Sequence, residues 1–414
     1  MKLLVYTEDT LAGELFTSDQ GICFKYNQDY LSKGGFPLSL SLPLTTEVHP
    51  QSSAEPFFEG LLPEGEQRRE LGRLLHVSTA STMNLLRALA GECIGNLILA
   101  DEEMDIADLQ YKSAYTPLSP EELEVLLRPQ SIERMNFIVS KRLSLAGAQA
   151  KIGLYHEAGE WFATEGLAPT THIIKPASLF DSSLLINEFF MMRLASNCGI
   201  QVPDTSIIRY GEHYGFVVER FDRRRIEGKV IRIGQEDFCQ ALSILPEAKY
   251  ENDGGPGFKE LFTTTLHQTA PPIQNILRLL RVVLFNYLTG NCDAHGKNFS
   301  LLQDPDSGYL SLTPAYDLVN TTYYGNRLFR SMAMRIGKHS RIDSITEADF
   351  SLFSVETGVA LEAISTELQS LCESITGSVD KVVEAISQEA EEYLPEVKLL
   401  REHLLQELEQ RVVS

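Results

Sequence analysis

The chain reads NYLTGNCDAHGKNFSLL over residues 286–302, and this is the most informative part of the sequence. An apolar run over residues 272–288 predicts a buried helix, which Gly290 is suited to end. Asp293 and Asn298 stand five residues apart in the polar loop that follows, just before a predicted strand. A carboxylate can orient and deprotonate a hydroxyl near neutral pH, and an amide oxygen is a hard, neutral ligand for a divalent cation. The loop therefore combines a candidate base with a candidate metal ligand.

The spacing D-x-x-x-x-N occurs in the catalytic loop of protein kinases, and three further patterns follow the order of a kinase chain. Asp317, 24 residues after Asp293, follows a predicted strand, where a kinase carries a second metal-binding carboxylate. Lys175 ends the short strand HIIKP and could reach nucleotide phosphates, while Glu188 in the next helix could pair with it. The small residues of SLAGAQAK, residues 144–151, would let backbone N–H groups approach a phosphate. Each pattern alone is common by chance, so the prediction depends on their order.

The same patterns, taken with their neighbours, resemble the HipA family of serine/threonine kinase toxins from bacterial toxin–antitoxin modules. Six ordered motifs carry the resemblance: S-x-A-G-A-Q-x-K at 144–151, H-I-I-K-P at 172–176, N-E-F-F-M-M-R-L-A at 187–195, V-E-R-F-D-R at 218–223, G-N-x-D-x-H-x-K-N at 290–298 and P-A-Y-D-L at 314–318. Ala150 departs from the family, in which Glu or Pro is frequent. The resemblance implies an α+β, bilobal, protein-kinase-like fold with a β-rich N-lobe, an extra N-terminal subdomain and an all-helical C-lobe.

The resemblance also implies roles for individual residues. Asp293 is similar to the catalytic base, Asn298 and Asp317 to the magnesium ligands, and Lys175 to the lysine on the ATP phosphates, with Glu188 as its partner. The implied ATP-binding residues also include Ala146, Gly147, Ala148, Gln149, Lys151, Glu219, Phe221, Asp222, His295, Lys297 and Asn298. Glu219–Phe221 resemble the hinge that meets adenine, Asp222 the residue near ribose, and His295 takes the place of the lysine that assists the transferring phosphate. Ser144 matches the serine whose autophosphorylation switches such kinases off.

Composition and turn residues predict the organisation of the chain. We expect an N-terminal subdomain over 1–100, a connector over 101–135, a kinase N-lobe over 136–224 and a helical C-lobe over 225–414. The N-lobe contains two predicted hairpins, with strands at 151–156 and 161–164 and at 205–210 and 214–220. The predicted helices include one that starts at Pro120 behind the cap Ser119, one at 184–198 and one at 236–242.

The charge balance limits the partners. The 414 residues include 36 Lys and Arg against 57 Asp and Glu, a net charge of −21, so direct binding to DNA is disfavoured. Six cysteines without a C-x-x-C pair, no signal-peptide pattern and no 18-residue apolar stretch predict a cytoplasmic protein that does not contact the membrane. Two basic segments, 219–232 and 327–341, are expected to be solvated faces, and the alternative is that they bind an acidic partner.

The resemblance implies a kinase that uses ATP and Mg²⁺ and that arrests growth by phosphorylating a translation-related protein, such as an aminoacyl-tRNA synthetase. Its implied partner is a small helix-turn-helix antitoxin similar to HipB, which would contact DNA on behalf of the complex. Two alternatives stay open. One is an ATP-binding co-repressor that completes an antitoxin–operator complex, and the other is an effector kinase without an antitoxin, for which no antitoxin reading frame would lie nearby.

Overall fold

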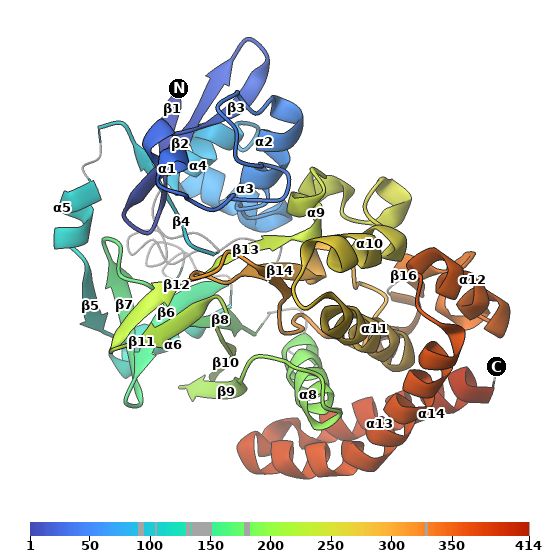
Figure 1. Ribbon diagram of the computed structural model, residues 1–414. Helices are drawn as coiled ribbons and strands as arrows, with labels where there is room; N and C mark the ends of the chain where they lie inside the picture. Colours follow the sequence, from blue (N-terminus) through green and yellow to red (C-terminus); the bar gives the residue numbers. More distant parts are fainter. Residues whose placement is uncertain are drawn as a thin grey trace. The chain divides into compact units, whose positions relative to one another are not determined.

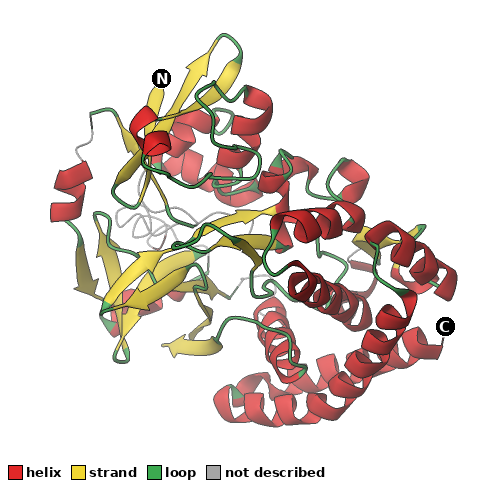
Figure 2. Cartoon of the chain, viewed as in Figure 1, coloured by secondary structure: helices red, strands yellow, loops and turns green. Residues whose placement is uncertain are grey.

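The computed structural model describes residues 1–89, 95–103, 106–129, 134, 151–177, 183–327 and 330–413. The chain divides into two compact units. The first consists of Met1–Leu179, Ile208–Glu247 and Leu302–Gly308, and the second of Phe180–Ile207, Ala248–Leu301 and Tyr309–Ser414. Most of the described strands lie in the first unit, whereas long helices form most of the second (Figure 2).

The first unit begins with an antiparallel sheet of order β3-β2-β1-β4 (Figure 1). Its strands are β1 (Lys2–Thr7), β2 (Thr10–Ser18), β3 (Gly21–Tyr26) and β4 (Leu97–Asp101). The accompanying helices are α1 (Gln28–Ser32), α2 (Gln51–Glu59), α3 (Gly65–Leu74) and α4 (Thr82–Ala88). Alternation along β1 buries Leu3 and Val5 on one face, where they pack with Phe24, Phe57 and Phe58 in one hydrophobic core.

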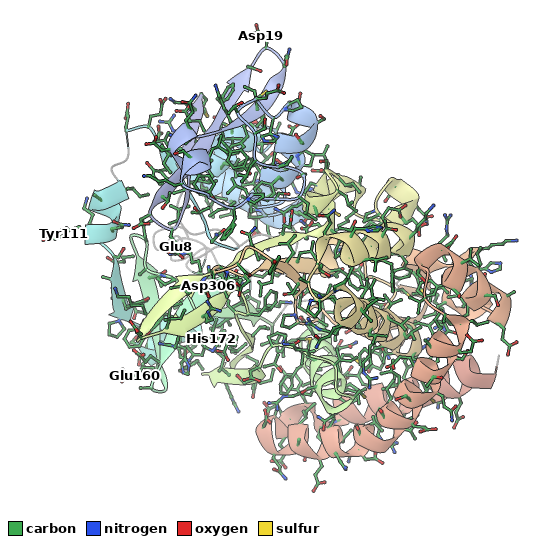
Figure 3. All side chains as sticks on the ribbon, in the orientation of Figure 1. Glu8, Asp19, Tyr111, Glu160, His172 and Asp306 are labelled. Atoms are coloured by element: carbon green, nitrogen blue, oxygen red, sulfur yellow. The ribbon has the colours of Figure 1, made fainter. Side chains whose placement is uncertain are left out.

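A second sheet in the first unit has the order β5-β7-β6-β8-β10-β9. It consists of β5 (Ala114–Pro117), β6 (Ile152–Glu157), β7 (Glu160–Glu165), β8 (His172–Pro176), β9 (Thr205–Tyr210) and β10 (His213–Glu219). Glu160 begins β7 after the β6–β7 turn, and His172 begins β8 on the other side of β6 in the sheet order (both labelled in Figure 3). The helix α6 (Pro120–Leu127) packs on β10, and its Leu123, Leu126 and Leu127 enter the core of this sheet. The remaining elements of this unit are α5 (Ile106–Tyr111), β11 (Arg223–Ile226), β12 (Lys229–Arg232), β13 (Gly234–Asp237) and α9 (Phe238–Ala241).

The second unit is built around α11 (Pro272–Thr289), a mostly buried helix that packs against α10, α13 and α14. The helix α8 (Ser183–Asn197) in turn packs on α13 and α14. The other helices are α10 (Phe258–Gln268), α12 (Glu347–Thr357), α13 (Leu361–Glu389) and α14 (Leu394–Val413). The strands are β15 (Leu310–Leu312), β16 (Ser331–Ile336) and β17 (His339–Arg341), and β14 (Ser300–Gln303) carries the chain back to the first unit.

The α+β class, both predicted hairpins and the helix behind Ser119 are confirmed. Ser119 and Glu122 form a reciprocal capping box, as their spacing predicts. Two expectations need correction. The C-lobe is not all helical, because β15 and the β16–β17 hairpin lie within it. Glu236 and Asp237 belong to β13, and only Phe238–Ala241 are helical. The strand β5, which was not predicted, lies in the expected connector and pairs with β7 from more than 40 residues further along the chain. Such long-range pairing leaves no local pattern.

The domain boundaries stay a prediction.

In the described part of the chain, no helix has both the length and the apolar composition required to cross a bilayer.

Candidate active site

The polar loop begins where α11 ends. Gly290 caps this helix in the left-handed conformation, with φ 76°. Its carbonyl accepts hydrogen bonds from the N–H groups of Thr321 (3.1 Å) and Thr322 (3.2 Å) and from the hydroxyl of Thr321 (3.0 Å). The same hydroxyl accepts the N–H of Cys292 at 2.8 Å. The start of the loop is therefore attached to the segment that follows Asp317.

Side chains of the loop itself fix its conformation. Asn291 donates to Asn286 Oδ1 at 3.0 Å and accepts the N–H of Asp293 at 3.2 Å. The N–H of His295 lies 2.8 Å from the carbonyl of Asp293 and 3.1 Å from Oδ1 of Asn298. Asp293 itself is exposed. The candidate base and the candidate metal ligand are thus brought together around one backbone N–H group.

A second segment that the sequence analysis did not single out reaches this loop. The hydroxyl of Tyr250 donates a 2.8 Å hydrogen bond to Oδ1 of Asp293, and its ring lies edge-on to that of His295, 5.2 Å away. The carbonyl of Lys249 accepts the N–H of Gly296 at 3.2 Å. The glycine pair after Tyr250 indicates a turn, but no local signal places that turn on a loop more than 40 residues away.

His295 is a buried, neutral imidazole. Burial lowers its pKa to about 3, and the positive charges of Lys249 and Lys297 act in the same direction, while Asp317 opposes them. The ring therefore cannot supply the positive charge that a lysine supplies at this place in ordinary kinases. Within the described part of the structure, Nδ1 of His295 is buried without a hydrogen-bond partner, and it can pair with a polar group of a bound molecule.

Asp317 is joined to the loop through its neighbours. Tyr316 donates a 2.6 Å hydrogen bond to the carbonyl of Lys297. Asp317 adopts a left-handed backbone conformation, φ 53°, which Asp tolerates better than most residues. Beyond it, Asn320 is held by Asn187 of α8, whose side chain donates to the Asn320 carbonyl and accepts its N–H, both at 2.9 Å. Glu188, the next residue of α8, is buried.

The donor set suits magnesium better than a metal held by protein ligands alone. The described residues contain no cluster of three or more His, Cys, Asp or Glu side chains that could hold a metal. Mg²⁺ usually keeps several waters and takes one or two protein ligands together with substrate phosphates. The amide oxygen of Asn298 and the carboxylate of Asp317 fit that requirement.

The remaining candidate residues with described structure lie in the first unit. Lys175 on β8 is 4% exposed and faces Phe216 of β10, with its Nζ 5.9 Å from the ring centroid. Lys151 directly precedes β6, and Glu219 ends β10 with its side chain exposed. Phe221 is half-buried just after β10. Ser144 and Ala146–Gln149 lie outside the described residues.

Asp222 is buried in a network of arginines. Arg220 donates to both carboxylate oxygens, at 2.9 and 2.7 Å, and Arg223 lies 3.0 Å from one of them. The N–H of Gly95 adds a hydrogen bond of 2.9 Å. Burial alone would raise the pKa of Asp222, but the two guanidinium groups and these hydrogen bonds hold it well below its ordinary value. The contact with ribose stays a prediction, and the packing shows a structural role.

Cys292, next to Asp293, does not have the lowered pKa of a reactive thiol, because burial raises its pKa to about 11. The two basic segments are largely neutralised within their own units. Arg224 pairs with Asp306 and Arg225 with Glu157. Arg330, Arg335 and Arg341 pair with Asp343, Glu251 and Asp343, respectively. These pairs favour the reading of solvated, ion-paired faces for 327–341 and for Arg224 and Arg225, whereas the side chains of Arg220, Arg223 and Arg232 are buried.

A strand-rich unit followed by a helical one, with Asp293, Asn298 and Asp317 joined in the latter, defines a protein of the protein-kinase-like class. Comparison with known proteins specifies it further. The family model described as HipA-like C-terminal domain matches residues 143–390, and the one described as HipA N-terminal domain matches residues 3–100. The chain therefore belongs to the HipA family of serine/threonine-protein kinases.

Individual relatives agree with this assignment. Y4mE of Sinorhizobium fredii is 36% identical over 93% of this chain and 92% of its own. The serine/threonine-protein kinase toxin HipA of Shewanella oneidensis is 31% identical over 92% of this chain and 89% of its own. A solved complex of HipA, HipB and operator DNA from Shewanella oneidensis superimposes with a TM-score of 0.85 and 27% identity, covering 99% of this chain and 97% of that one. The predicted resemblance to the HipA family is confirmed.

Proposed function

We propose that this kinase uses ATP and Mg²⁺ to phosphorylate serine or threonine residues of a protein, and that it acts as the toxin of a HipA/HipB-type module. The observation that supports this most directly is the exposed Asp293 carboxylate on a loop fixed by Asn291, His295 and Tyr250. A base needs to lie in a fixed position within hydrogen-bond reach of the hydroxyl that it deprotonates. The substrate that the family implies is a translation-related protein, such as an aminoacyl-tRNA synthetase.

Each residue has a proposed part in the transfer. Asp293 orients the acceptor hydroxyl and takes its proton, while Lys175 pairs with phosphate oxygens of the nucleotide and Glu188 orients Lys175. Asn298 and Asp317 would hold magnesium, which supplies charge neutralisation when bound. His295 offers a neutral ring nitrogen rather than a charge, as its lowered pKa requires. Lys297, Lys151 and the loop Ala146–Gln149 would contact phosphates, and Glu219, Phe221 and Asp222 the nucleoside.

The test is phosphate transfer from radiolabelled ATP in the presence of magnesium, with wild type compared with Asp293→Asn. Asp380→Asn is the matched control, because Asp380 is an exposed acid on α13 whose side chain is 71% accessible. We expect label on Ser144 and on a protein in a cell extract with wild type and with the control, and none with Asp293→Asn. Intact mass is measured first, since prior phosphorylation of Ser144 would hide transfer. An unphosphorylated wild type that binds ATP and transfers nothing would refute the kinase function.

A second role is favoured by the similar complex, whose title names HipA, HipB and operator DNA together. In that role the chain completes a DNA-bound complex with a helix-turn-helix antitoxin, and the −21 net charge assigns DNA contact to the partner. A gel-shift titration of the antitoxin on its operator tests it. If the role is correct, wild type and Asp293→Asn increase the affinity of the antitoxin for its operator by the same factor. If neither changes the antitoxin's affinity for operator, the role is excluded.

A further inference from the structure

The segment Lys249–Gly257 of the second unit belongs to none of the family motifs that carried the sequence analysis. It forms a tight turn, in which the carbonyl of Tyr250 accepts the N–H groups of Asp253 and Gly255, both at 2.9 Å. Gly254 has φ +95°, and a Cβ at Gly255 would lie 2.4 Å from the carbonyl oxygen of Ala248. Gly255 therefore leaves no room for a Cβ, and Gly254 adopts a backbone conformation that other residues rarely take.

This turn is anchored on both sides of Tyr250. On one side, the carbonyl of Lys249 accepts the N–H of Gly296 in the catalytic loop at 3.2 Å. On the other side, the Glu251 carboxylate accepts the N–H of Arg335 on β16 at 2.7 Å and pairs with its Nε at 3.0 Å. Because hydrogen bonds hold the residues on both sides of Tyr250, its phenol ring can move little. Its edge-on contact with His295 restricts the ring further.

The anchored phenol acts on the orientation of the Asp293 carboxylate. Its hydroxyl lies 2.8 Å from Oδ1, so rotation of the carboxylate about Cβ–Cγ would break a hydrogen bond to a charged acceptor. In the transfer, the acceptor oxygen attacks the γ-phosphorus, the bond between that phosphorus and the oxygen of the departing ADP breaks, and the hydroxyl proton passes to Asp293. A base fixed in rotation presents the same oxygen to each acceptor hydroxyl.

We propose that Tyr250 is a positioning residue for this kinase, which holds the Asp293 carboxylate in the orientation that accepts the proton. The inference rests on the proposed function of Asp293. In this proposal, Lys249–Gly257 belongs to the part of the active site where the acceptor hydroxyl binds. A different reading of the same 2.8 Å contact is that Tyr250 itself accepts phosphate, and the experiment separates the two.

Tyr250→Phe removes only the hydroxyl and leaves the ring on His295. Tyr30→Phe is the matched control, because Tyr30 donates an equally short bond of 2.7 Å to the carbonyl of Phe36 in the first unit. For Tyr250→Phe we expect kcat to fall about tenfold, with the KM for ATP within about twofold of wild type. The acidic limb of its kcat profile should move to higher pH, because a carboxylate that has lost a donor holds a proton more tightly. Tyr30→Phe should change neither.

Each outcome has one meaning. If wild type transfers phosphate and Asp293→Asn does not, but Tyr250→Phe matches wild type in kcat and pH profile, the positioning role is refuted and the kinase function stands. If wild type transfers nothing, both fall. Label on Tyr250 in wild type would show an acceptor and refute the positioning role. Should Tyr250→Phe fail to fold, Glu251→Gln serves, since it keeps the phenol hydroxyl but weakens the anchor to Arg335 that holds the phenol in position. Glu251→Gln should shift kcat and the acidic limb in the same direction, and an unchanged profile would refute the role.

Discussion

Asn187 and Asn320 exchange two hydrogen bonds of 2.9 Å, with the side chain of one pairing with the backbone N–H and C=O of the other. Both residues are buried, and Asn320 lies three residues after Asp317. The pair thus connects α8, the helix of Glu188, to the segment that carries the proposed metal-binding carboxylate. Only an amide side chain offers a donor and an acceptor in the geometry that matches a peptide group.

Replacing Asn187 by Leu should loosen this connection. The buried N–H and C=O of Asn320 would lose these partners, at a cost of about 2–4 kcal/mol in the free energy of unfolding. Because the displaced segment carries Asp317, the magnesium concentration for half-maximal activity should rise by about tenfold. Thermal unfolding and a magnesium titration of phosphate transfer measure the two effects. The control is Asn197→Leu on the same helix, where the side chain is exposed and donates to the carbonyl of Arg193 in that helix. Equal magnesium requirements in the two variants would contradict the coupling.

Gly290→Ala should damage both stability and activity. A Cβ at this left-handed position would meet the Thr322 hydroxyl oxygen at 2.4 Å, and the Gly290 carbonyl anchors the segment after Asp317. Gly358 is a matched control, because it also caps a helix at φ +73° but a Cβ there meets nothing within 4 Å. We expect Gly358→Ala to cost about 1 kcal/mol, from backbone conformation alone, and Gly290→Ala to cost at least about 2 kcal/mol more. Chemical denaturation and transfer assays provide the comparison. Similar losses of stability in both variants would show that the Thr322 side chain moves and relieves the clash.

The sequence predicted those features that depend on neighbouring residues. The end of α11 at Gly290 and the loop from Asp293 to Asn298 are local patterns, and the structure keeps them in one connected site. Tyr250 could not be predicted, because its bond to Asp293 spans 43 residues. The arginines near Asp222 looked like an exposed basic run, yet Arg220 and Asp222 are buried together. Tertiary packing decides which charged residues of a segment are buried in ion pairs. The periodicity of the sequence does not indicate this.

Glu236 gives the first unit a pH-dependent stability. Its carboxylate accepts the Leu40 N–H at 3.0 Å and the Ser39 hydroxyl, and burial raises its pKa to about 7 despite these bonds. A folded-state pKa above the unfolded value means that the contribution is fully present below about pH 4.5 and is lost as the pH rises through 7. Glu236→Gln cannot ionise, so its free energy of unfolding relative to wild type should increase by about 2–3 kcal/mol between pH 5 and pH 8.

Denaturant unfolding at both pH values measures that difference. Glu212→Gln makes the same substitution at an exposed residue, on the turn before β10, and serves as the control. A constant difference for Glu236→Gln would mean that Glu236 ionises in the folded protein as readily as in the unfolded chain.

Asp222→Ala distinguishes a structural role from a role in nucleotide binding. The substitution leaves Arg220 and Arg223 in the same buried network without their carboxylate, and Arg220 is only 1% exposed. Removing one partner of a buried ion pair costs about 3–5 kcal/mol, because the remaining charge keeps its desolvation penalty. We therefore expect a large fall in melting temperature, and Arg220→Met combined with Asp222→Leu should recover much of it, since no unpaired charge from that pair remains. The KM for ATP is measured on the stable double variant. A KM equal to that of wild type would assign Asp222 to the fold alone, whereas a KM raised tenfold or more would support the predicted contact with ribose.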